Sequence, residues 1–494
     1  MLKIAFAAAE FAPLIKTGGL ADVAAGLTRF LATVESDQRI FLPAYDTLAD
    51  QGEERRVEPA VQDVPIRMGD RELRFSLQTM RVPGCHHAIH LVDCPALFHR
   101  GHAYTWDPDE HVRWGLFCRA VLESCQRLNF APDIIHAHDW HAALLPVYLR
   151  SLYAWDGLFA DTRTLLTIHN LAYQGEFDRG VLPDLGLASA WTKFPRPRLD
   201  AGRVCFLEAG IANADWISTV SRTYSHEIRT PGGGMGLDGA MQARGDRVVG
   251  IVNGVDISAW SPEHDPHLPR TYGVDEMAGK RACRDALLTE VGLDPEPAGP
   301  VFGMIARLTW QKGVDLVLEA SEAILSGAAT GGRAGADTRL VVLGAGDQSI
   351  EDGLFALQEH FPGRVRFWCG YHEALAHRIE AGSDLFLMPS RFEPCGLNQM
   401  YSQRYGTPPI VHRTGGLADT VRHHAPGADT GTGFVFDHAD AQGLRWAVGE
   451  AMNAWEHPKA WAALQRRCME LDWSWHRQGR EYLLLYDRMM TQPR

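Results

Sequence analysis

The sequence predicts an α/β protein that folds as two doubly wound domains. The chain has 494 residues, which is too many for one hydrophobic core and suits two domains. Short apolar runs alternate with helical patterns in both halves of the chain, as they do in parallel α/β sheets. One six-residue sequence, TGGLAD, occurs in each half, at residues 17–22 and 414–419, and such a repeat indicates two related units.

In the first half of the chain, short apolar runs bounded by polar residues predict buried parallel strands. These runs lie at residues 2–9, 39–43, 88–92, 133–137, 164–168, 216–220 and 248–252. Apolar residues at helical spacing predict helices at residues 20–34, 111–128, 139–149 and 203–212. The polar region 50–87 shows no clear pattern, so we assign it no element.

The second half repeats this alternation, with predicted strands at residues 301–305, 340–343, 365–368, 385–388, 409–411 and 433–436. Prolines are frequent between residues 256 and 298, which indicates a linker. After residue 455 the patterns are helical and rich in aromatic residues, so these helices are expected to pack back on the first domain. We therefore expect an N-terminal domain at residues 1–255, a linker and hinge at 256–298, a C-terminal domain at 299–455 and terminal helices at 456–494.

The composition is that of an ordinary globular protein, with 46% hydrophobic and 22% charged residues. The net charge of −13 argues against nucleic acid or a membrane as the partner. The nine cysteines are scattered without a C-x-x-C pair, which fits a reducing compartment. The apolar N-terminus lacks the basic start of a signal peptide and no uncharged run reaches the length of a membrane span, so we expect a cytoplasmic protein.

Both copies of TGGLAD follow a cation, Lys16 or Arg413, and precede a helical pattern. At such a position, backbone N–H groups and the helix N-terminus favour an anion. For either copy alone, a tight glycine turn that merely closes the chain is an equally good interpretation. Two matched copies instead favour two domains whose glycine loops face one ligand across a cleft.

A further pair of cations, Arg307 and Lys312, follows the predicted strand at 301–305 and opens a helix. Cations at the start of a helix oppose its dipole unless an anion is bound. Arginine supplies a planar fork for phosphate oxygens and lysine a point charge. The pair therefore predicts a phosphate clamp rather than ordinary surface cations.

The sequence HAHDWH at 136–141 places three imidazoles and the carboxylate of Asp139 within six residues. Such a cluster could hold zinc. However, His136 and His138 share one strand face, whereas Asp139 and His141 enter a helix. Without a further distant ligand, polar groups for substrate hydroxyls are the preferred interpretation.

Glu393 and Cys395 lie in RFEPCG at 391–396, after another predicted strand. Glu393 could pair with the neighbouring Arg391 or meet sugar hydroxyls, and taken alone the ion pair is favoured. No histidine is fixed beside Cys395 in the sequence, which disfavours cysteine catalysis. The sequence GAGD at 344–347 lacks the third glycine of a dinucleotide fingerprint and is weak evidence for NAD.

Together these motifs resemble those of family 5 glycosyltransferases, the bacterial glycogen synthases and plant starch synthases. The matching blocks run in order along nearly the whole chain. They are KTGGLADV at 16–23, HAHDWHAAL at 136–144, TIHNLAYQG at 167–175, NGVD at 253–256, ARLTWQKGVD at 306–315, GYHEALAHRI at 370–379 and RFEPCGLNQMYSQRYGTPPIVHRTGGLADTV at 391–421.

The resemblance implies a GT-B fold, in which two Rossmann-like domains face a deep cleft. It implies transfer of glucose from ADP-glucose to the non-reducing end of an α-1,4-glucan such as glycogen, with retention of anomeric configuration and release of ADP. It also implies that no metal or other cofactor is required. The oligomeric state stays open.

The resemblance also implies roles for individual residues. The expected catalytic residues are Asp139, His169, Arg307, Lys312 and Glu393. The expected substrate-binding residues are Lys16, Gly18, Gly19, Asp22, His141, Asn253, Tyr371, Cys395, Gly396, Gly415 and Gly416. Arg307 and Lys312 should neutralise the departing phosphates, and Tyr371 should stack near the adenine.

Asn398 departs from the family pattern, which often has threonine at this position, and puts one contact near the diphosphate in doubt. Three alternatives stay open. They are a transferase of the same fold that uses UDP-glucose, a glucan-binding relative that has lost catalysis, and a metal-dependent hydrolase built on the histidine cluster. The repeated TGGLAD and the HAHDWH block favour the glucan synthases.

Overall fold

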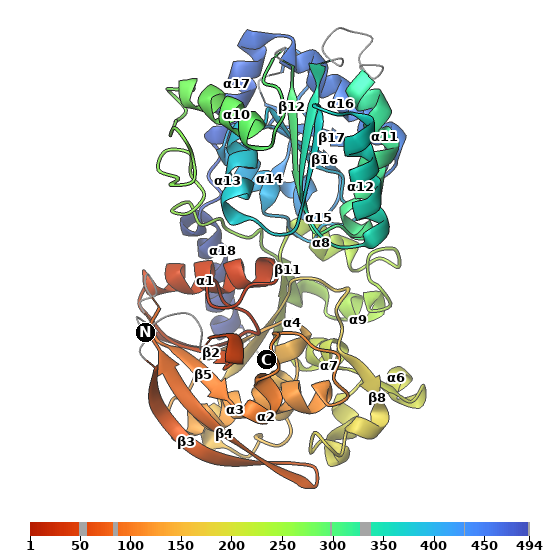
Figure 1. Ribbon diagram of the computed structural model, residues 1–494. Coiled ribbons are helices and arrows are strands. Elements are labelled where there is room, and N and C mark those ends of the chain that lie inside the picture. Colours follow the sequence, from red (N-terminus) through yellow and green to blue (C-terminus); the bar gives the residue numbers. More distant parts are fainter. Residues whose placement is uncertain (49–56, 83–86, 297–298, 327–336, 429, 493–494) are drawn as a thin grey trace. The chain divides into compact units, whose positions relative to one another are not determined.

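The computed structural model describes residues 1–48, 57–82, 87–296, 299–326, 337–428 and 430–492. The chain forms two compact units, shown in Figure 1 and treated separately below. Unit 1 contains residues 1–254 and 475–494, and unit 2 contains residues 255–474. Among the described helices, none combines the length and apolar character needed to cross a membrane.

Unit 1 is built on a mixed sheet whose described strands follow the order β11-β10-β7-β6-β1-β2-β5-β4-β3. The strands are β1 (Leu2–Ala7), β2 (Ser36–Pro43), β3 (Val57–Met68), β4 (Arg71–Met80), β5 (Ile89–Asp93), β6 (Ile134–His138), β7 (Arg163–Ile168), β10 (Trp216–Thr219) and β11 (Val248–Gly250). The pairs β3–β4 and β4–β5 are antiparallel, and the other pairs are parallel.

Unit 1 contains helices both against this sheet and in the segments that connect its strands. They are α1 (Gly19–Ala32), α2 (Pro95–Phe98), α3 (Glu110–Arg127), α4 (Asp139–Ala142), α5 (Leu145–Leu149), α6 (Arg196–Asp200), α7 (Phe206–Asn213), α8 (Arg222–Glu227), α9 (Asp238–Ala243) and α18 (Trp475–Thr491). A separate antiparallel pair is formed by β8 (Glu176–Asp178) and β9 (Arg203–Cys205). The predicted helix at 139–149 is divided into α4 and α5, and the predicted helix at 203–212 begins with β9.

The central position of β1 brings the polar groups of unit 1 to one edge. Residues 4–7 of β1 are fully buried, as expected for a parallel strand covered on both faces. β1 lies between β2 and β6, with Ala7 opposite Ala137, and β6 continues with His138 opposite Thr167 of β7. Because these strands are parallel, the residues after their carboxyl ends share one edge of the sheet, where ligands of such sheets bind.

The hairpin β3–β4 extends the sheet in the region to which we assigned no element from the sequence (Figure 1). Gly69 and Asp70 form the turn between the strands, and Gly69 has a φ of 62°, which suits glycine. β3 carries Pro59 and Pro65, which are tolerated because it is the edge strand. Exposed residues on one face of this hairpin obscure the apolar pattern.

Unit 2 is built on a parallel sheet with the strand order β14-β13-β12-β15-β16-β17 among the described residues. The strands are β12 (Val301–Ile305), β13 (Arg339–Gly344), β14 (Val365–Cys369), β15 (Leu385–Met388), β16 (Pro409–His412) and β17 (Phe434–Phe436). The helices are α10 (Ala278–Glu290), α11 (Val314–Ser326), α12 (Gln348–His360), α13 (Glu373–Gly382), α14 (Asn398–Arg404), α15 (Gly415–Thr420), α16 (Ala441–Trp455) and α17 (Pro458–Met469).

Alternate residues of the strands in unit 2 point to two different cores. Phe302 and Val342 pack with helices α11, α12 and α16 on one face of the sheet. Val301 and Val341 pack with helices α10 and α13 on the other face. Unit 2 is therefore doubly wound, as predicted, with every strand close to its expected position.

The domain boundaries differ from the predicted ones. Residues 256–298 do not form a separate linker, because they belong to unit 2 with α10 packed against α13. Unit 2 also extends past residue 455 and includes α17, so of the predicted terminal helices α18 alone belongs to unit 1.

Helix α18 packs on α1 through close contacts at glycine. The buried indole of Trp475 lies so near Gly26 that a Cβ there would be 1.9 Å from Nε1 of Trp475. Gly479 of α18 likewise leaves room for the ring of Phe30. The last helix is thus held within unit 1 by glycines that admit aromatic rings.

Candidate active site

Glu10 organises the first glycine loop at the end of β1. It is 3% exposed, and its Oε2 accepts hydrogen bonds from the backbone N–H groups of Thr17 at 2.5 Å and Gly18 at 3.1 Å. Its Oε1 accepts a hydrogen bond from the hydroxyl of Tyr104. Burial raises the pKa of Glu10. The three hydrogen bonds lower it, whereas the nearby Asp22 also raises it, and the net shift is upward. A buried carboxyl therefore fixes the loop that leads into α1.

The loop itself presents a cation and open backbone. Nζ of Lys16 lies 2.9 Å from Oδ1 of Asp22, and both side chains are partly exposed. Gly18 has an extended conformation, and apart from its chain neighbours no described atom lies within 4 Å of where a Cβ would be. Gly19 begins α1. The protein's own packing therefore does not require glycine at position 18, which leaves room for a group that approaches the backbone.

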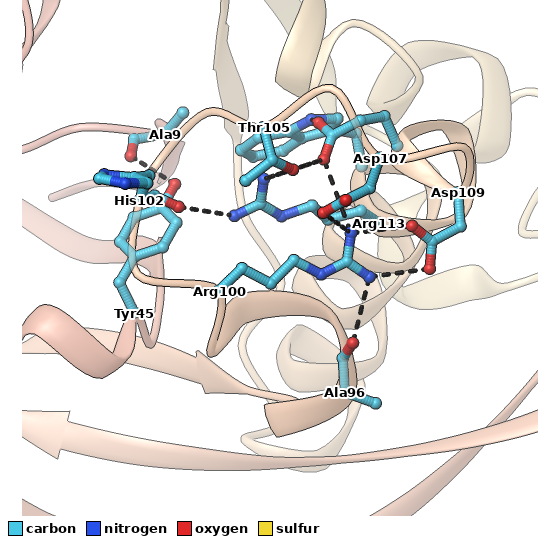
Figure 2. Close-up of polar contacts among 11 residues, drawn as sticks. Ala9, Tyr45, Ala96, Arg100, His102, Thr105, Asp107, Asp109 and Arg113 are labelled. Atoms are coloured by element: carbon cyan, nitrogen blue, oxygen red, sulfur yellow. Dashed lines mark hydrogen bonds and ion pairs between the residues drawn. The ribbon is translucent and has the colours of Figure 1, made fainter.

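The loop 99–109, which contains Tyr104, is held by Arg100 through the contacts shown in Figure 2. Nη1 of Arg100 donates to Asp107 at 2.9 Å and to Asp109 at 2.8 Å. Nη2 donates to the second oxygen of Asp109 at 2.8 Å and to the carbonyl of Ala96 at 3.1 Å. This bidentate pairing fixes the guanidinium, and with it the path of the loop.

Arg113 holds the same loop from inside the core (Figure 2). It is fully buried and donates to Glu110 at 3.1 Å, to Thr105 at 3.4 Å and to the carbonyl of His102 at 3.4 Å. Nε1 of Trp114 donates to the other oxygen of Glu110 at 2.8 Å. The charge of Arg113 is thus compensated by a carboxylate that has its own donors, as a buried ion pair requires.

Asp139 begins α4 in a left-handed conformation, with a φ of 55°. Its Oδ1 accepts a hydrogen bond from the backbone N–H of His169 at 2.7 Å. Burial raises the pKa of Asp139 to about 7, against the opposing effect of the N–H groups of His169 and Asn170. Strained backbone and a carboxyl that titrates near neutrality are both typical of functional sites.

The imidazoles of β6 and of His169, which follows β7, form hydrogen bonds with neighbouring side chains. Nδ1 of His138 lies 2.9 Å from Nε2 of His169. Nδ1 of His136 lies 2.8 Å from the hydroxyl of Tyr486, and its Nε2 lies 2.6 Å from Oγ1 of Thr167. Burial lowers the pKa of His136 and His138 well below the ordinary value, so both rings are neutral.

His141 lies in α4 and stacks on Tyr104 with ring centroids 4.9 Å apart. It also meets the ring of Trp114 edge-on, and burial lowers its pKa. Within the described part of the chain, no group of three or more His, Cys, Asp or Glu side chains is arranged to hold a metal. The geometry thus gives no support to the zinc interpretation of the histidine cluster.

Asn253 follows β11, at the edge of the sheet in unit 1. Its side chain is 4% exposed, and its Oδ1 has no hydrogen-bond partner among the described residues. Because a buried polar atom without a partner is costly, this carbonyl oxygen is available to a ligand.

In unit 2, Glu393 pairs with Lys312 and not with Arg391. Nζ of Lys312 lies 2.6 Å from Oε2 of Glu393, which also accepts a hydrogen bond from Ser390 at 3.0 Å. Arg391 instead makes a bidentate pair with Asp315, at 2.7 and 2.6 Å. The sequence alternative that paired Glu393 with its neighbour Arg391 is therefore wrong.

The second TGGLAD loop packs directly on the segment that carries Glu393. A Cβ at Gly415, which has a φ of 42°, would lie 2.0 Å from the carbonyl oxygen of Glu393. A Cβ at Gly416 would lie 2.1 Å from the carbonyl oxygen of Cys395. The N–H of Gly416 donates to the carbonyl of Glu393 at 3.1 Å. These two glycines therefore allow the loop to hold residues 393–396 in place.

Cys395 and Gly396 lie in the held segment. Cys395 is buried and forms no disulfide, and Gly396 has a φ of 74°. Asn398 donates to the carbonyl of Ile305, at the end of β12, at 2.8 Å. The amide that replaces the expected threonine thus joins α14 to the strand before Arg307.

Arg307 and Tyr371 follow β12 and β14 at the carboxyl edge of the second sheet. Between Arg307 and Lys312 the chain makes a short turn that ends at Gly313, whose φ is 66°. Tyr371 is 80% exposed, and its hydroxyl donates to the neighbouring Glu373. An exposed ring at this edge is free to stack on a planar group.

The structure brings some of the expected residues into contact within each unit. In unit 1 it joins Asp139 to His169 and Lys16 to Asp22, and in unit 2 it joins Lys312 to Glu393. The sequence analysis did not identify the roles of Tyr104 or Arg113. The bond from Tyr104 to Glu10 joins residues distant in sequence, and Arg113 stands in no recognised motif.

Family models match both units. Residues 3–243 match the starch synthase catalytic domain, and residues 293–467 match the glycosyl transferases group 1. With the doubly wound architecture of each unit, these matches define a glycosyltransferase of the GT-B class.

Related proteins show to which family of glycosyltransferases the chain belongs. A glycogen synthase of Myxococcus xanthus (strain DK1622) is 42% identical over 99% of this chain and 100% of its own length. A glycogen synthase of Geobacillus stearothermophilus is 39% identical, over 99% and 98%. The chain belongs to the glycogen synthase family.

Two solved structures support the fold. The catalytic domain of starch synthase IV from Arabidopsis thaliana, bound to ADP and acarbose, has a TM-score of 0.89 and 33% identity, with 99% of each chain covered. A sucrose-phosphate synthase from Thermosynechococcus elongatus has a TM-score of 0.63 and 16% identity, also with 99% of each chain covered, and shows a shared fold alone.

Proposed function

We propose that this glycosyltransferase transfers glucose from ADP-glucose to the non-reducing end of an α-1,4-glucan, with retention of configuration and release of ADP. The main observation behind the proposal is the ion pair between Lys312 and Glu393. Glu393 lies in a segment that packs against the turn at Gly415-Gly416. The starch synthase relative that binds ADP and acarbose, a nucleotide and a sugar, supports the same substrate classes.

In the proposed reaction, the bond from the anomeric carbon to the β-phosphate oxygen breaks as the acceptor 4-hydroxyl attacks from the same face. The acceptor proton passes to an oxygen of the departing ADP. Arg307 and Lys312 stabilise the negative charge that develops on this leaving group, which is the main electrostatic requirement of the step. Because the two cations meet that requirement, we propose that no metal or other cofactor takes part.

Unit 2 supplies the remaining donor contacts in this proposal. Glu393 and Gly396 hold the glucosyl group and the distal phosphate. Gly415 and Gly416 support this binding by close packing, since the N–H of Gly416 donates to the carbonyl of Glu393 and keeps the segment in place. Cys395 lies in the same held segment and has a binding role rather than that of a nucleophile. Tyr371 stacks on the adenine.

Unit 1 supplies contacts to the reacting sugar and the diphosphate. Asp139 orients the acceptor, and His169 contacts a sugar hydroxyl. Lys16, with Asp22 fixing its side chain, meets the diphosphate beside the open backbone of Gly18 and Gly19. The open carbonyl of Asn253 and the ring of His141 complete the binding groups. The proposal includes no paired carboxylates for double displacement.

The test is transfer of labelled glucose onto glycogen by the Lys312→Ala variant. Loss of one group that stabilises the leaving charge is expected to lower kcat by about 10²–10³-fold. The matched control is Lys459→Ala, which removes an exposed lysine from α17 and should leave kcat unchanged. A Lys312→Ala variant that transfers glucose at the wild-type rate would remove the proposed role of this pair.

A further inference from the structure

His138 is a buried imidazole with one hydrogen-bonded nitrogen. The residue is fully buried, and its ring packs against the rings of Phe6 and His136, with centroids 4.2 and 4.1 Å away. Its Nδ1 lies 2.9 Å from Nε2 of His169. Its Nε2 is buried and has no hydrogen-bond partner among the described residues. The bond to His169 is therefore the single hydrogen bond of the ring among the described residues. The packing against Phe6 and His136 limits rotation of the ring.

The bond between the two imidazoles needs one donor and one acceptor. Two neutral arrangements satisfy it. In the first, His138 donates from Nδ1, and His169 accepts at Nε2 and carries its own proton on Nδ1. In the second, His169 donates from Nε2, and His138 carries its proton on the buried Nε2.

The surroundings of His138 favour the first arrangement. The second places an N–H donor at the buried Nε2 of His138, where no acceptor lies among the described residues. Buried N–H groups without partners are rarer than acceptors that lack one. Burial lowers the pKa of His138 well below the ordinary value, and that of the partly exposed His169 to about 3, so both rings are neutral.

Neighbouring groups do not compete for these protons. Both nitrogens of His136 are already bonded, to Tyr486 and Thr167. Asp139, the carboxyl nearest in the chain, accepts the backbone N–H of His169 at its Oδ1. The tautomer of His169 is therefore decided by His138.

We propose that His138 is a positioning residue that holds His169 as the Nδ1–H tautomer, so that His169 presents a hydrogen-bond donor to the transferred sugar. The contact with sugar rests on the proposed function, whereas the tautomer does not. Protonation of His169 at Nε2 would require either that the bond to His138 break or that His138 carry its proton on the buried Nε2, where no acceptor lies among the described residues. His169 therefore remains neutral and orients a hydroxyl oxygen, and it does not serve as a proton donor to the leaving group.

The first test is nitrogen NMR of the histidine rings in the full chain, with His169 assigned by its loss in a His169→Ala variant. The expected result is a protonated Nδ1 and an unprotonated Nε2 that do not change between about pH 5 and pH 8, where free imidazole titrates. A proton on Nε2 of His169, or titration in this range, would overturn the proposal. Since this measurement needs no substrate, it is independent of whether the proposed function is correct.

The second test is kinetic. His138→Leu removes the donor. Loss of a partner that orients a metal-bound imidazole costs about 10–100-fold, and by analogy kcat should fall by a similar factor with KM for glycogen unchanged. His138→Asn, whose side-chain N–H is as many bonds from Cα as Nδ1, should restore kcat to within a few-fold of wild type. The control Tyr486→Phe loses a buried hydrogen bond to His136 and should keep both kcat and the tautomer. Wild-type kcat in His138→Leu, or an asparagine variant no better than leucine, would contradict the proposal.

Discussion

Asp139 adopts a left-handed backbone conformation that residues other than glycine rarely adopt. Aspartate tolerates it better than most residues, and the bond from the His169 N–H to its carboxylate stabilises it. The same geometry places a carboxyl with a raised pKa at the edge of the sheet. The sequence predicted Asp139 as a site residue, but neither its strain nor its titration could be read from residue order.

The raised pKa of Asp139 has a consequence for stability. A carboxyl whose pKa rises from 3.8 when unfolded to about 7 when folded binds more protons in the folded state between these values. Its contribution to the free energy of unfolding is therefore lost as pH rises through this range. We expect Asp139→Asn to be stabilised relative to wild type by about 2–3 kcal/mol more at pH 8 than at pH 5. Urea unfolding of both proteins at both pH values measures this difference in the free energy of unfolding. A difference between variant and wild type that is the same at pH 5 and pH 8 would exclude the raised pKa.

A glycine-to-alanine substitution should affect the stability of the protein differently in the two TGGLAD loops. Gly415 has a positive φ and no space for a Cβ beside Glu393, so Gly415→Ala should destabilise the protein by about 1–3 kcal/mol. Gly18 is extended and open, so Gly18→Ala should leave stability within about 0.5 kcal/mol of wild type. If the open backbone receives the diphosphate, Gly18→Ala should still raise KM for the donor. Thermal unfolding together with donor kinetics would separate these effects, and a donor KM unchanged in Gly18→Ala would argue against a ligand at this loop.

At the scale of elements, the apolar runs predicted the parallel strands of both sheets to within a few residues. They succeeded because central parallel strands are buried on both faces and therefore apolar throughout. The β3–β4 hairpin was not predicted, because its residues alternate between buried and exposed and its edge strand carries prolines. The turn at Gly69-Asp70 was the signal available in the sequence.

The packing of α18 on α1 makes Gly26 a test of how the last helix is held. Gly26→Ala would force the indole of Trp475 to move, which should lower the free energy of unfolding by about 1–3 kcal/mol. Gly239→Ala is the matched control, because this helical glycine of α9 has open space around it. Since alanine favours the helix, the control should be stabilised by about 0.5–1 kcal/mol. Equal stability of the two variants in chemical unfolding would contradict this account of the α1–α18 contact.

An ion pair joins the segment before α10 to the body of unit 2. Nδ1 of His377 lies 2.7 Å from Oδ2 of Asp265, which also accepts the hydroxyl of Tyr405. Burial alone would lower the pKa of His377, but hydrogen bonds to Asp265 and Glu373 outweigh it and raise the pKa. Burial alone would raise the pKa of Asp265, but its hydrogen bonds lower it.

The directions of these two pKa shifts define the pH range in which the ion pair stabilises the protein. The stability contributed by His377 is present below about pH 6.5 and is lost as pH rises through its raised pKa. The contribution of Asp265 is lost as pH falls below about 4 through its lowered pKa. His377→Gln should therefore destabilise the protein most between these values and less at pH 8. The exposed His264→Gln is the control, and a penalty for His377→Gln that does not depend on pH would refute the ion pair.

At the scale of the whole molecule, the sequence predicted two doubly wound units and their family, and the structure and relatives confirm both. The boundaries were predicted less well. Proline-rich composition showed where helices and strands are interrupted between residues 256 and 298. It could not show that Lys280 is buried there, with its ammonium donating to carbonyls of Ala381 and Tyr405.

The candidate site was predictable where its residues stand in short motifs and not where they meet across the sequence. The motifs supplied Lys16, Asp139, His169 and Lys312. Pairing of Lys312 with Glu393 required the structure, because the two are 81 residues apart. The bond from Tyr104 to Glu10 spans 94 residues and leaves no local pattern.

We propose that the chain transfers glucose from ADP-glucose to an α-1,4-glucan without a metal, and one experiment tests this claim. The most direct measurement is incorporation of labelled glucose into glycogen from ADP-glucose and from UDP-glucose, side by side and with EDTA present. We predict strong incorporation from ADP-glucose, little from UDP-glucose and no effect of the chelator. Preference for UDP-glucose, loss of transfer with EDTA, or no incorporation from either donor would contradict the claim.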